Sequence, residues 1–325
     1  MITVKLTCPG WPVQRQTPGQ KGIWGNCRFL CNTEGGRCDY WFVIEGLAGK
    51  TDQAVCPREN LVFITAEPPT LRTYKQVFIN QFAAVITCHD KMDHPNKIVG
   101  HGCLPWHVGR RQKDHANIAF SKDYDELKAI RHIDKTAQMS VVVSSKDDSR
   151  GHRQRLDFAR QLKEYFGDRI DLFGRGINEI EDKWDALAPY KYHVAIENSA
   201  VADYWTEKLS DAFLAGCHPV YYGCPNIDTY FPQGALTPID ITKPDEAVNI
   251  IEMCLSTERY EQSRDLIRES RRLVLDKHNM FATIADYVNT DIRQSGEKKA
   301  PGTIKLKKEP SDSNLLYRLK KTFAP

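Results

Sequence analysis

The stretch from Tyr190 to Gly223 constrains the fold of this chain more than any other part of the sequence. It reads YKYHVAIENSAVADYWTEKLSDAFLAGCHPVYYG. An apolar run at 193–196 leads into a polar turn, a helix is predicted to begin at Thr206, and a second apolar run follows at 219–222. Strand, loop, helix and strand in this order form the repeating unit of a parallel α/β sheet.

Ligands of such sheets bind where strands end and helices begin, because backbone amides and helix dipoles point there. In this stretch the polar side chains fall at that edge: Glu197, Asn198, Tyr204, Glu207 and Lys208. The sequence therefore predicts a ligand site between the first strand and the helix.

The chain of 325 residues is long enough for two domains of ordinary size. A new series of strands begins near Met139, so we predict an N-terminal domain at 1–137, a C-terminal domain at 138–294 and a tail at 295–325. There is no apolar run of about 18 residues, and the N-terminus lacks the basic and apolar regions of a signal peptide. We expect a cytoplasmic protein, with association to a membrane surface left open.

Apolar runs and turn residues predict the remaining elements. Strands are expected at 2–7, 39–47, 61–65, 84–87, 139–144 and 170–173. Helices are expected at 71–82, 121–137, 153–166, 244–256, 257–276 and 281–293. Two segments rich in Gly and Pro, 8–38 and 93–117, are expected to be long loops.

The basic character of the chain is concentrated in its tail. Residues 297–321 hold eight Lys or Arg and three Asp or Glu, a net charge of +5, so the other residues sum to −2 against the total of +3. A nearly neutral body argues against a nucleic-acid surface. Most of 298–321 is too polar to fold alone. The apolar residues at 315–323 are typical of a basic amphipathic segment in peripheral contact with a membrane, and a solvated tail is the alternative.

Ten cysteines are scattered through the chain without a zinc-binding pattern, since no C-x2-C pair is present. Cys27, Cys31 and Cys38 cluster in sequence, but buried free thiols are the simpler interpretation. One or two disulfides are the alternative for an exported protein. We expect no metal site.

Several enzyme classes are disfavoured by missing motifs. The absence of GxGxxG disfavours a dinucleotide-dependent oxidoreductase, and the absence of GxxxxGK[ST] disfavours a P-loop enzyme. The absence of GxSxG disfavours an α/β-hydrolase, and no DxD pair is well placed for a metal-dependent nucleotide-sugar site. Arg155 and Lys208 remain as candidates for binding a diphosphate, because each is predicted near the start of a helix. A surface salt bridge is the alternative for Arg155, and an ordinary helix start is the alternative for Lys208.

At this point a resemblance to a known family is evident. YKYHVAIENS…DYWTEKLSDAFLAGCHPVYYG resembles the signature of the α-1,3/4-fucosyltransferases, glycosyltransferase family 10. VFITAEPPT at 62–70, the helix with Arg155 and IDLFGRG at 170–176 are similar to further family segments. Trp205 stands where the family often has Ile or another apolar residue, and Ile196 stands where Phe is commoner.

The resemblance implies an α/β protein of GT-B architecture, with two Rossmann-like domains facing each other across a cleft. It implies an inverting enzyme for protein glycosylation or glycan biosynthesis that uses GDP-fucose and an oligosaccharide acceptor, without a metal or other cofactor. The acceptor hydroxyl is expected to be O3 of GlcNAc or Glc. By this resemblance Glu67 is the general base, and the donor is bound by Arg155, Asn198, Tyr204, Glu207 and Lys208.

Partial burial at the end of a strand suits Glu67 for the role of base, because burial favours a pKa near neutrality. A loop carboxylate without a task is the alternative. Three other functions stay open. The first is a GT-B enzyme with a different nucleotide-sugar donor, the second is a non-catalytic sugar- or nucleotide-binding module, and the third is a nucleic-acid binder acting through the tail.

Overall fold

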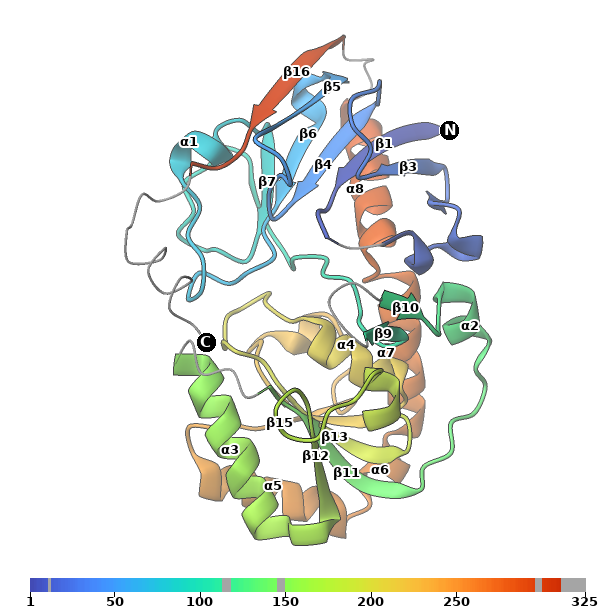
Figure 1. The fold of residues 1–325 in the computed structure, drawn as a ribbon, viewed down its shortest axis with the longest axis vertical. Helices are drawn as coiled ribbons and strands as arrows, with labels where there is room; N and C mark the ends of the chain where they lie inside the picture. Colours follow the sequence, from blue (N-terminus) through green and yellow to red (C-terminus); the bar gives the residue numbers. More distant parts are fainter. Residues whose placement is uncertain (11–12, 113–117, 145–149, 296–299, 311–325) are drawn as a thin grey trace.

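Two parallel sheets, one from each half of the chain, form the frame of the molecule (Figure 1). The computed structural model describes residues 1–10, 13–112, 118–144, 150–295 and 300–310. The first sheet has the order β2-β3-β1-β4-β6-β7-β8, and the second has the order β12-β11-β13-β14-β15. All neighbouring strands in both sheets are parallel except β2 and β3.

The strands of the first sheet are β1 (Ile2–Thr7), β2 (Ile23–Trp24), β3 (Cys27–Cys31), β4 (Tyr40–Ile44), β6 (Leu61–Ile64), β7 (Ala84–Thr87) and β8 (Lys97–Val99). Those of the second sheet are β11 (Ala137–Val142), β12 (Ile170–Phe173), β13 (Tyr190–Ile196), β14 (His218–Tyr222) and β15 (Thr237–Pro238). Two antiparallel pairs complete the strands of the described residues: β5 (Thr51–Pro57) with β16 (Pro301–Lys307), and β9 (Arg110–Gln112) with β10 (Ile118–Phe120).

The α-helices are α1 (Gln76–Ile79), α2 (Tyr124–Ala129), α3 (Arg150–Phe166), α4 (Glu207–Leu214), α5 (Pro244–Ser256), α6 (Arg259–Gln262), α7 (Arg264–Asp276) and α8 (Met280–Ser295). Short 3-10 helices lie at Val13–Gln16, Pro18–Gln20, Arg58–Asn60, Gly167–Arg169, Lys183–Ala186 and Ile227–Thr229. No helix among the described residues is long and apolar enough to cross a membrane.

The predicted central stretch is confirmed as β13, α4 and β14, in the expected order. All seven residues of β13 except Lys191 are buried, as is usual for a parallel strand that is covered on both faces. Thr206 caps α4, because its side-chain oxygen accepts a hydrogen bond from the N–H of Lys208. Gly216 follows α4 with a φ of 69°, a left-handed conformation that favours glycine.

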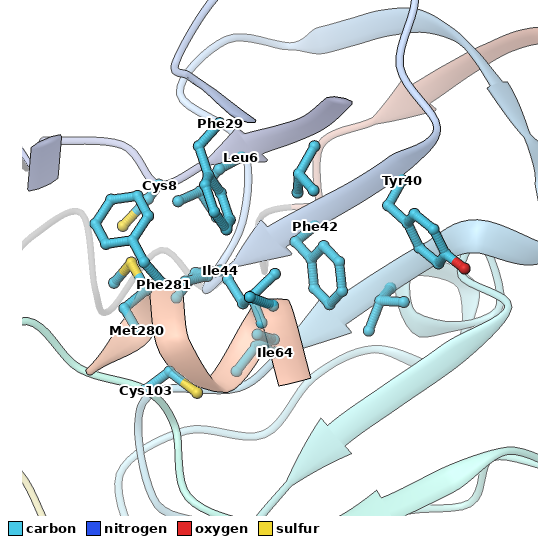
Figure 2. Packing of buried hydrophobic residues seen from close by; sticks show 14 of the residues in the cluster. Leu6, Cys8, Phe29, Tyr40, Phe42, Ile44, Ile64, Cys103, Met280 and Phe281 are labelled. Atoms are coloured by element: carbon cyan, nitrogen blue, oxygen red, sulfur yellow. The ribbon is translucent and has the colours of Figure 1, made fainter. Parts of the chain in front are cut away.

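Helix α8 comes last among the helices of the described residues, yet it packs against the first sheet (Figure 1). Met280, Phe281 and Ile284 join the core formed by β1, β3, β4 and β6. Figure 2 shows Phe281 beside Phe29 of β3, and their ring centroids lie 4.8 Å apart in an edge-to-face arrangement. The packing of α8 shows that the chain returns to its first half after the second sheet. The division at 1–137, 138–294 and 295–325 stays a prediction.

The polar tail needs one correction. Pro301–Lys307 forms β16, which pairs with β5 along its whole length, so this segment folds by pairing rather than alone. Ile304 and Leu306 alternate with exposed residues and are buried among Phe63, Phe78 and their neighbours. The predicted amphipathic segment at 315–323 lies outside the described residues.

Other expectations need correction for similar reasons. The expected loop at 8–38 contains β3, which pairs in parallel with β1. The helix expected at 71–82 is limited to α1, and the helix expected at 121–137 is limited to α2. The helix expected at 257–276 is divided into α6 and α7 at Ser263.

Candidate functional site

A pocket of about 530 Å³ contains side chains from both halves of the chain. The first half contributes Glu45, Glu67, Arg72 and His107 to its lining, and the second half contributes Asn198, Tyr204, Glu207 and Lys208. The structure therefore brings together five of the six predicted site residues. Arg155, the sixth, is buried and does not line this pocket.

Glu67 lies three residues after the end of β6, in the turn that contains Pro68 and Pro69. Its side chain is half-buried. Its carbonyl oxygen lies 2.8 Å from Nε2 of His89, and its N–H donates to Oε2 of Glu45 at 3.3 Å. Burial raises the pKa of Glu67, and the negative charge of Glu45 raises it further, whereas Lys208 lowers it.

The opposite wall is built around Glu197, which is completely buried at the end of β13. Its Oε1 accepts the N–H of Thr206 at 2.8 Å, and its two oxygens lie 2.9 and 2.8 Å from the Thr206 hydroxyl. Lys208 Nζ lies 3.3 Å from its Oε2. Glu197 thus joins the end of β13 to the first turn of α4 and supports Lys208.

Lys208 and Glu207 form an ion pair at 3.1 Å at the start of α4. Burial opposes the charge on Lys208, but Glu197 and Glu207 outweigh it and raise the pKa of the ammonium group. Burial also opposes the charge on Glu207, yet Lys208, His107 and Lys183 hold its pKa well below the usual range. Both side chains are therefore charged at neutral pH, and they offer a cation and a hydrogen-bond acceptor to a ligand.

Further charged side chains lie near Glu207. Lys183 Nζ lies 3.7 Å from Glu207 Oε1 and 3.1 Å from Oδ2 of the buried Asp211. Asp211 also accepts the backbone N–H groups of His107 and Val108, at 2.8 and 3.1 Å. Burial lowers the pKa of His107 to about 3, so its imidazole is neutral at physiological pH.

Arg155 lies on α3 and is buried, with 7% of its surface exposed. Burial lowers the pKa of its guanidinium, and the negative charges of Glu197 and Glu207, the two carboxylates that also interact with Lys208, counteract that effect. Its Nε has no hydrogen-bond partner among the described residues. Buried polar atoms are usually paired, so this atom is a candidate donor to a ligand.

The start of α3 packs closely against the loop after β13. A Cβ at Gly151 would lie 2.1 Å from the carbonyl oxygen of Asn198, so only glycine permits this approach. The side chain of Asn198 accepts a hydrogen bond from the Tyr204 hydroxyl at 3.0 Å. Asn198 and Tyr204 therefore form one face of the pocket, next to the start of α4.

Sequence reasoning missed several lining residues. Glu45 directly follows the buried strand β4 and precedes Gly46, a signal of the same kind as Glu67 after β6. His107 lies in a segment expected to be exposed loop, but Trp106 and Val108 on either side of it are buried. Lys308 and Glu309 reach the pocket after β16, and no motif indicated them.

No group of three or more His, Cys, Asp or Glu side chains is arranged for a metal ion within the described part of the chain. The ten cysteines are free, and nine of them are buried.

Comparisons with known proteins place these features in context. Residues 133–262 match the family model described as "Glycosyltransferase family 10 (fucosyltransferase) C-term". "GDP-fucose protein O-fucosyltransferase 3" of Danio rerio is 30% identical over 116 residues, which is 31% of this chain and 24% of that protein. "Alpha-(1,3)-fucosyltransferase 4" of Bos taurus is 36% identical over 114 residues, which is 33% of this chain and 27% of that protein. The matched part thus spans about a quarter of each relative.

A solved structure, described as "Crystal Structure of alpha1,3-Fucosyltransferase", covers 81% of this chain and 80% of its own, with a TM-score of 0.50 and 17% identity. At this identity the likeness concerns the fold alone. It agrees with the two facing parallel sheets of this molecule, and the expected GT-B architecture is confirmed.

Proposed function

We propose, on the premise that this chain belongs to glycosyltransferase family 10 through residues 133–262, that it transfers L-fucose from GDP-fucose to a hydroxyl group of an oligosaccharide. The name of the Danio rerio relative refers to the same donor. The observation that carries the proposal is the meeting of Glu67 with Glu207 and Lys208 in one pocket, because general base and donor site must lie within reach of one acceptor hydroxyl.

The donor side of the proposal rests on two cations. Lys208 is held in its charged form by Glu197 and Glu207, and the buried Arg155 has an Nε without a hydrogen-bond partner in the part of the chain that the structure describes. Negative charge develops on the diphosphate as the bond to fucose breaks, and fixed cations stabilise that charge. Glu207 would accept hydrogen bonds from sugar or ribose hydroxyls. Asn198 and Tyr204 would form the adjoining wall, with no metal required.

The acceptor side rests on Glu67. In the proposed reaction its carboxylate takes the proton of the acceptor hydroxyl, and the acceptor oxygen forms a bond with the anomeric carbon. The bond from that carbon to the GDP oxygen breaks on the opposite face, so the configuration is inverted. The raised pKa of Glu67 favours this step, because a base works best when its pKa lies near the operating pH. We propose O3 of GlcNAc or Glc as the acceptor position.

The test is a transfer assay with labelled GDP-fucose, in EDTA, against a panel of oligosaccharide acceptors. Peptide acceptors belong in the same panel, because the name of the Danio rerio relative refers to a protein. Glu67→Gln should abolish transfer and leave the Kd for GDP-fucose within about twofold, since the substitution keeps the size of the side chain. Glu59→Gln, an exposed site in the same half, is the matched control and should transfer normally.

The outcomes separate the alternatives. Tighter binding of another nucleotide sugar than of GDP-fucose would identify a different donor. Binding of GDP-fucose without turnover on any acceptor would indicate a non-catalytic module. Loss of GDP-fucose binding in Glu67→Gln would contradict the assignment of the base, and complete dependence on a divalent cation would contradict the metal-free mechanism.

A further inference from the structure

The carboxylate of Glu45 is surrounded by donors from the segment that carries Glu67. Its Oε2 accepts the N–H of Ala66 at 2.8 Å and the N–H of Glu67 at 3.3 Å. The same oxygen accepts the hydroxyl of Tyr74 at 2.7 Å, and Oε1 forms an ion pair with Arg72. Every one of these donors lies between positions 66 and 74, so one side chain fixes both ends of the turn.

A second carboxylate holds the same segment from the other side. Glu309 Oε2 lies 2.9 Å from a guanidinium nitrogen of Arg72, and its Oε1 accepts the N–H of Lys75 at 2.6 Å. Arg72 is therefore shared between Glu45 and Glu309. Strand β16 brings Glu309 to this place through its pairing with β5.

The backbone at Glu45 is also unusual. Its φ of 66° lies in the left-handed region, although it is not a glycine. Such a conformation costs about 1–3 kcal/mol and persists where the surroundings demand it. The glycine of this segment, Gly46, is the next residue, so the left-handed conformation falls on a glutamate although a glycine stands beside it. The conformation at Glu45 places a carboxylate, which glycine lacks, beside the backbone of Glu67.

We propose that Glu45 is the positioning residue of Glu67: its carboxylate fixes the backbone of the base. The negative charge of Glu45 beside this backbone also tunes the base. Arg72 and Glu309 complete the frame, so residues after β16 take part in building the site. The inference rests on the proposed role of Glu67 as the general base. It goes beyond that role by assigning how the base is oriented and tuned.

The charged groups around Glu67 determine how its pKa should change when one of them is substituted. Burial raises the pKa of Glu67, and Glu45 and Glu207 raise it further, while Lys208 and Arg72 lower it. Tyr74 and Tyr204 also interact electrostatically with the carboxylate of Glu67, and Nε2 of His89 lies 2.8 Å from the carbonyl oxygen of Glu67. Removing the negative charge of Glu45 must lower the pKa of Glu67. Removing the positive charge of Arg72 must raise it.

The test compares kcat as a function of pH in four proteins. A general base acts when deprotonated, so kcat rises with pH through the pKa of Glu67. In Glu45→Gln this rise should move to lower pH by roughly one unit, with a fall in kcat of about tenfold and an unchanged KM for GDP-fucose. In Arg72→Gln the rise should move to higher pH. Tyr74→Phe removes a contact with Glu45 but no charge, so the rise should stay in place.

A purely structural role for Glu45 would not produce shifts of opposite sign in Glu45→Gln and Arg72→Gln. The proposal is overturned if the rise of kcat with pH stays in place in both variants, or if it shifts in the same direction in both. The pKa of Glu67 can also be followed without substrate, by NMR titration of 13C-labelled glutamate carboxyls, with Glu67→Gln identifying the resonance. If the wild-type protein transfers no fucose, the proposed function fails, while the NMR titration of Glu45→Gln and Arg72→Gln still decides whether Glu45 tunes Glu67.

Discussion

The hydroxyl of Thr70 and the hydroxyl of Ser199 form a hydrogen bond that joins the two halves of the molecule beside the pocket. Thr70 follows the Pro-Pro turn after Glu67, and Ser199 follows Asn198 after β13. The contact therefore links the segment of the proposed base to the segment of the proposed donor site. A small displacement of one segment against the other changes the distance on which the proposed transfer depends.

We expect Thr70→Val to increase the KM for the acceptor and lower kcat by about threefold to tenfold. The change keeps the shape of the side chain and removes one hydrogen bond, whose net value is about 0.5–1.5 kcal/mol. Steady-state kinetics with GDP-fucose in excess measure the effect. In a double-mutant cycle with Ser199→Ala, the two effects should not add, because either change breaks the same bond. Full additivity would contradict a functional link.

Arg155 provides a prediction about the donor alone. Arg155→Gln should weaken GDP-fucose binding by about tenfold or more, since a charge-assisted hydrogen bond to a phosphate contributes about 1.5–3 kcal/mol. Isothermal titration calorimetry with GDP-fucose and GDP measures it. Arg160→Gln is the matched control on the same helix, because Arg160 is 68% exposed and forms a long ion pair of 3.8 Å with Asp157. Equal affinities of the two variants would exclude Arg155 from the site.

The half of the pocket formed by β13 and α4 was predictable because its signals are local in sequence. Glu197, Thr206 and Lys208 lie within twelve positions, so one strand-loop-helix unit brings them together. Glu67 was predictable for a similar reason, because it follows a short buried strand and precedes two prolines. Parallel strands align their carboxyl ends, which places such residues at one edge of each sheet.

The rest of the site depends on contacts between distant segments. Glu309 reaches the pocket only because β16 pairs with β5, across about 250 positions of chain. Hydrophobic periodicity gives no information on which strand accepts such a partner. The same limit explains α8, whose apolar face is evident in sequence while its packing against the first sheet is not.

Strand β16 leads to a prediction about stability. Leu306 is completely buried between β5 and the first sheet, so Leu306→Ala should lower the free energy of unfolding by about 2–5 kcal/mol. Thr303→Ala on the same strand is the control, because Thr303 is exposed and its loss should leave stability nearly unchanged. Urea denaturation measures both. A similar stability for the two variants would show that β16 contributes little to the fold.

Buried histidines predict a loss of stability in acid. Burial lowers the pKa of His101 to about 3 and that of His278 to about 4, and the two rings lie 5.6 Å apart. Between pH 6.5 and 4 the unfolded chain takes up these protons and the folded protein does not. The free energy of unfolding therefore falls as the pH falls, by about 1.4 kcal/mol per pH unit for each histidine.

The substitution His101→Phe isolates one of these contributions. It keeps an aromatic ring against Trp205, whose centroid lies 4.8 Å from that of His101, and it removes the titrating group. We expect urea midpoints of this variant to fall less steeply than those of the wild type between pH 6.5 and 4.5. Parallel pH profiles would contradict a neutral buried His101.

The last prediction concerns Glu197, which holds Lys208 and Thr206 from a completely buried position. Glu197→Ala leaves the ammonium of Lys208 with only one of its two carboxylates and leaves the N–H of Thr206 without its acceptor. Breaking a buried ion pair costs about 3–5 kcal/mol, so the free energy of unfolding should fall by about that amount. Donor affinity should fall too, because Lys208 loses its support.

The substitution Glu197→Gln removes the negative charge of the side chain and keeps its size and shape. Its amide oxygen can still accept the N–H of Thr206, so the loss of stability should be smaller than in Glu197→Ala, while the loss of donor affinity remains. Glu246→Ala is the control, because Glu246 forms an exposed ion pair with Lys243 at 3.3 Å and such pairs contribute little. Chemical denaturation and calorimetric titration with GDP-fucose measure the two effects. If Glu197→Gln bound GDP-fucose as tightly as the wild type, the charge of Glu197 would have no part in orienting Lys208.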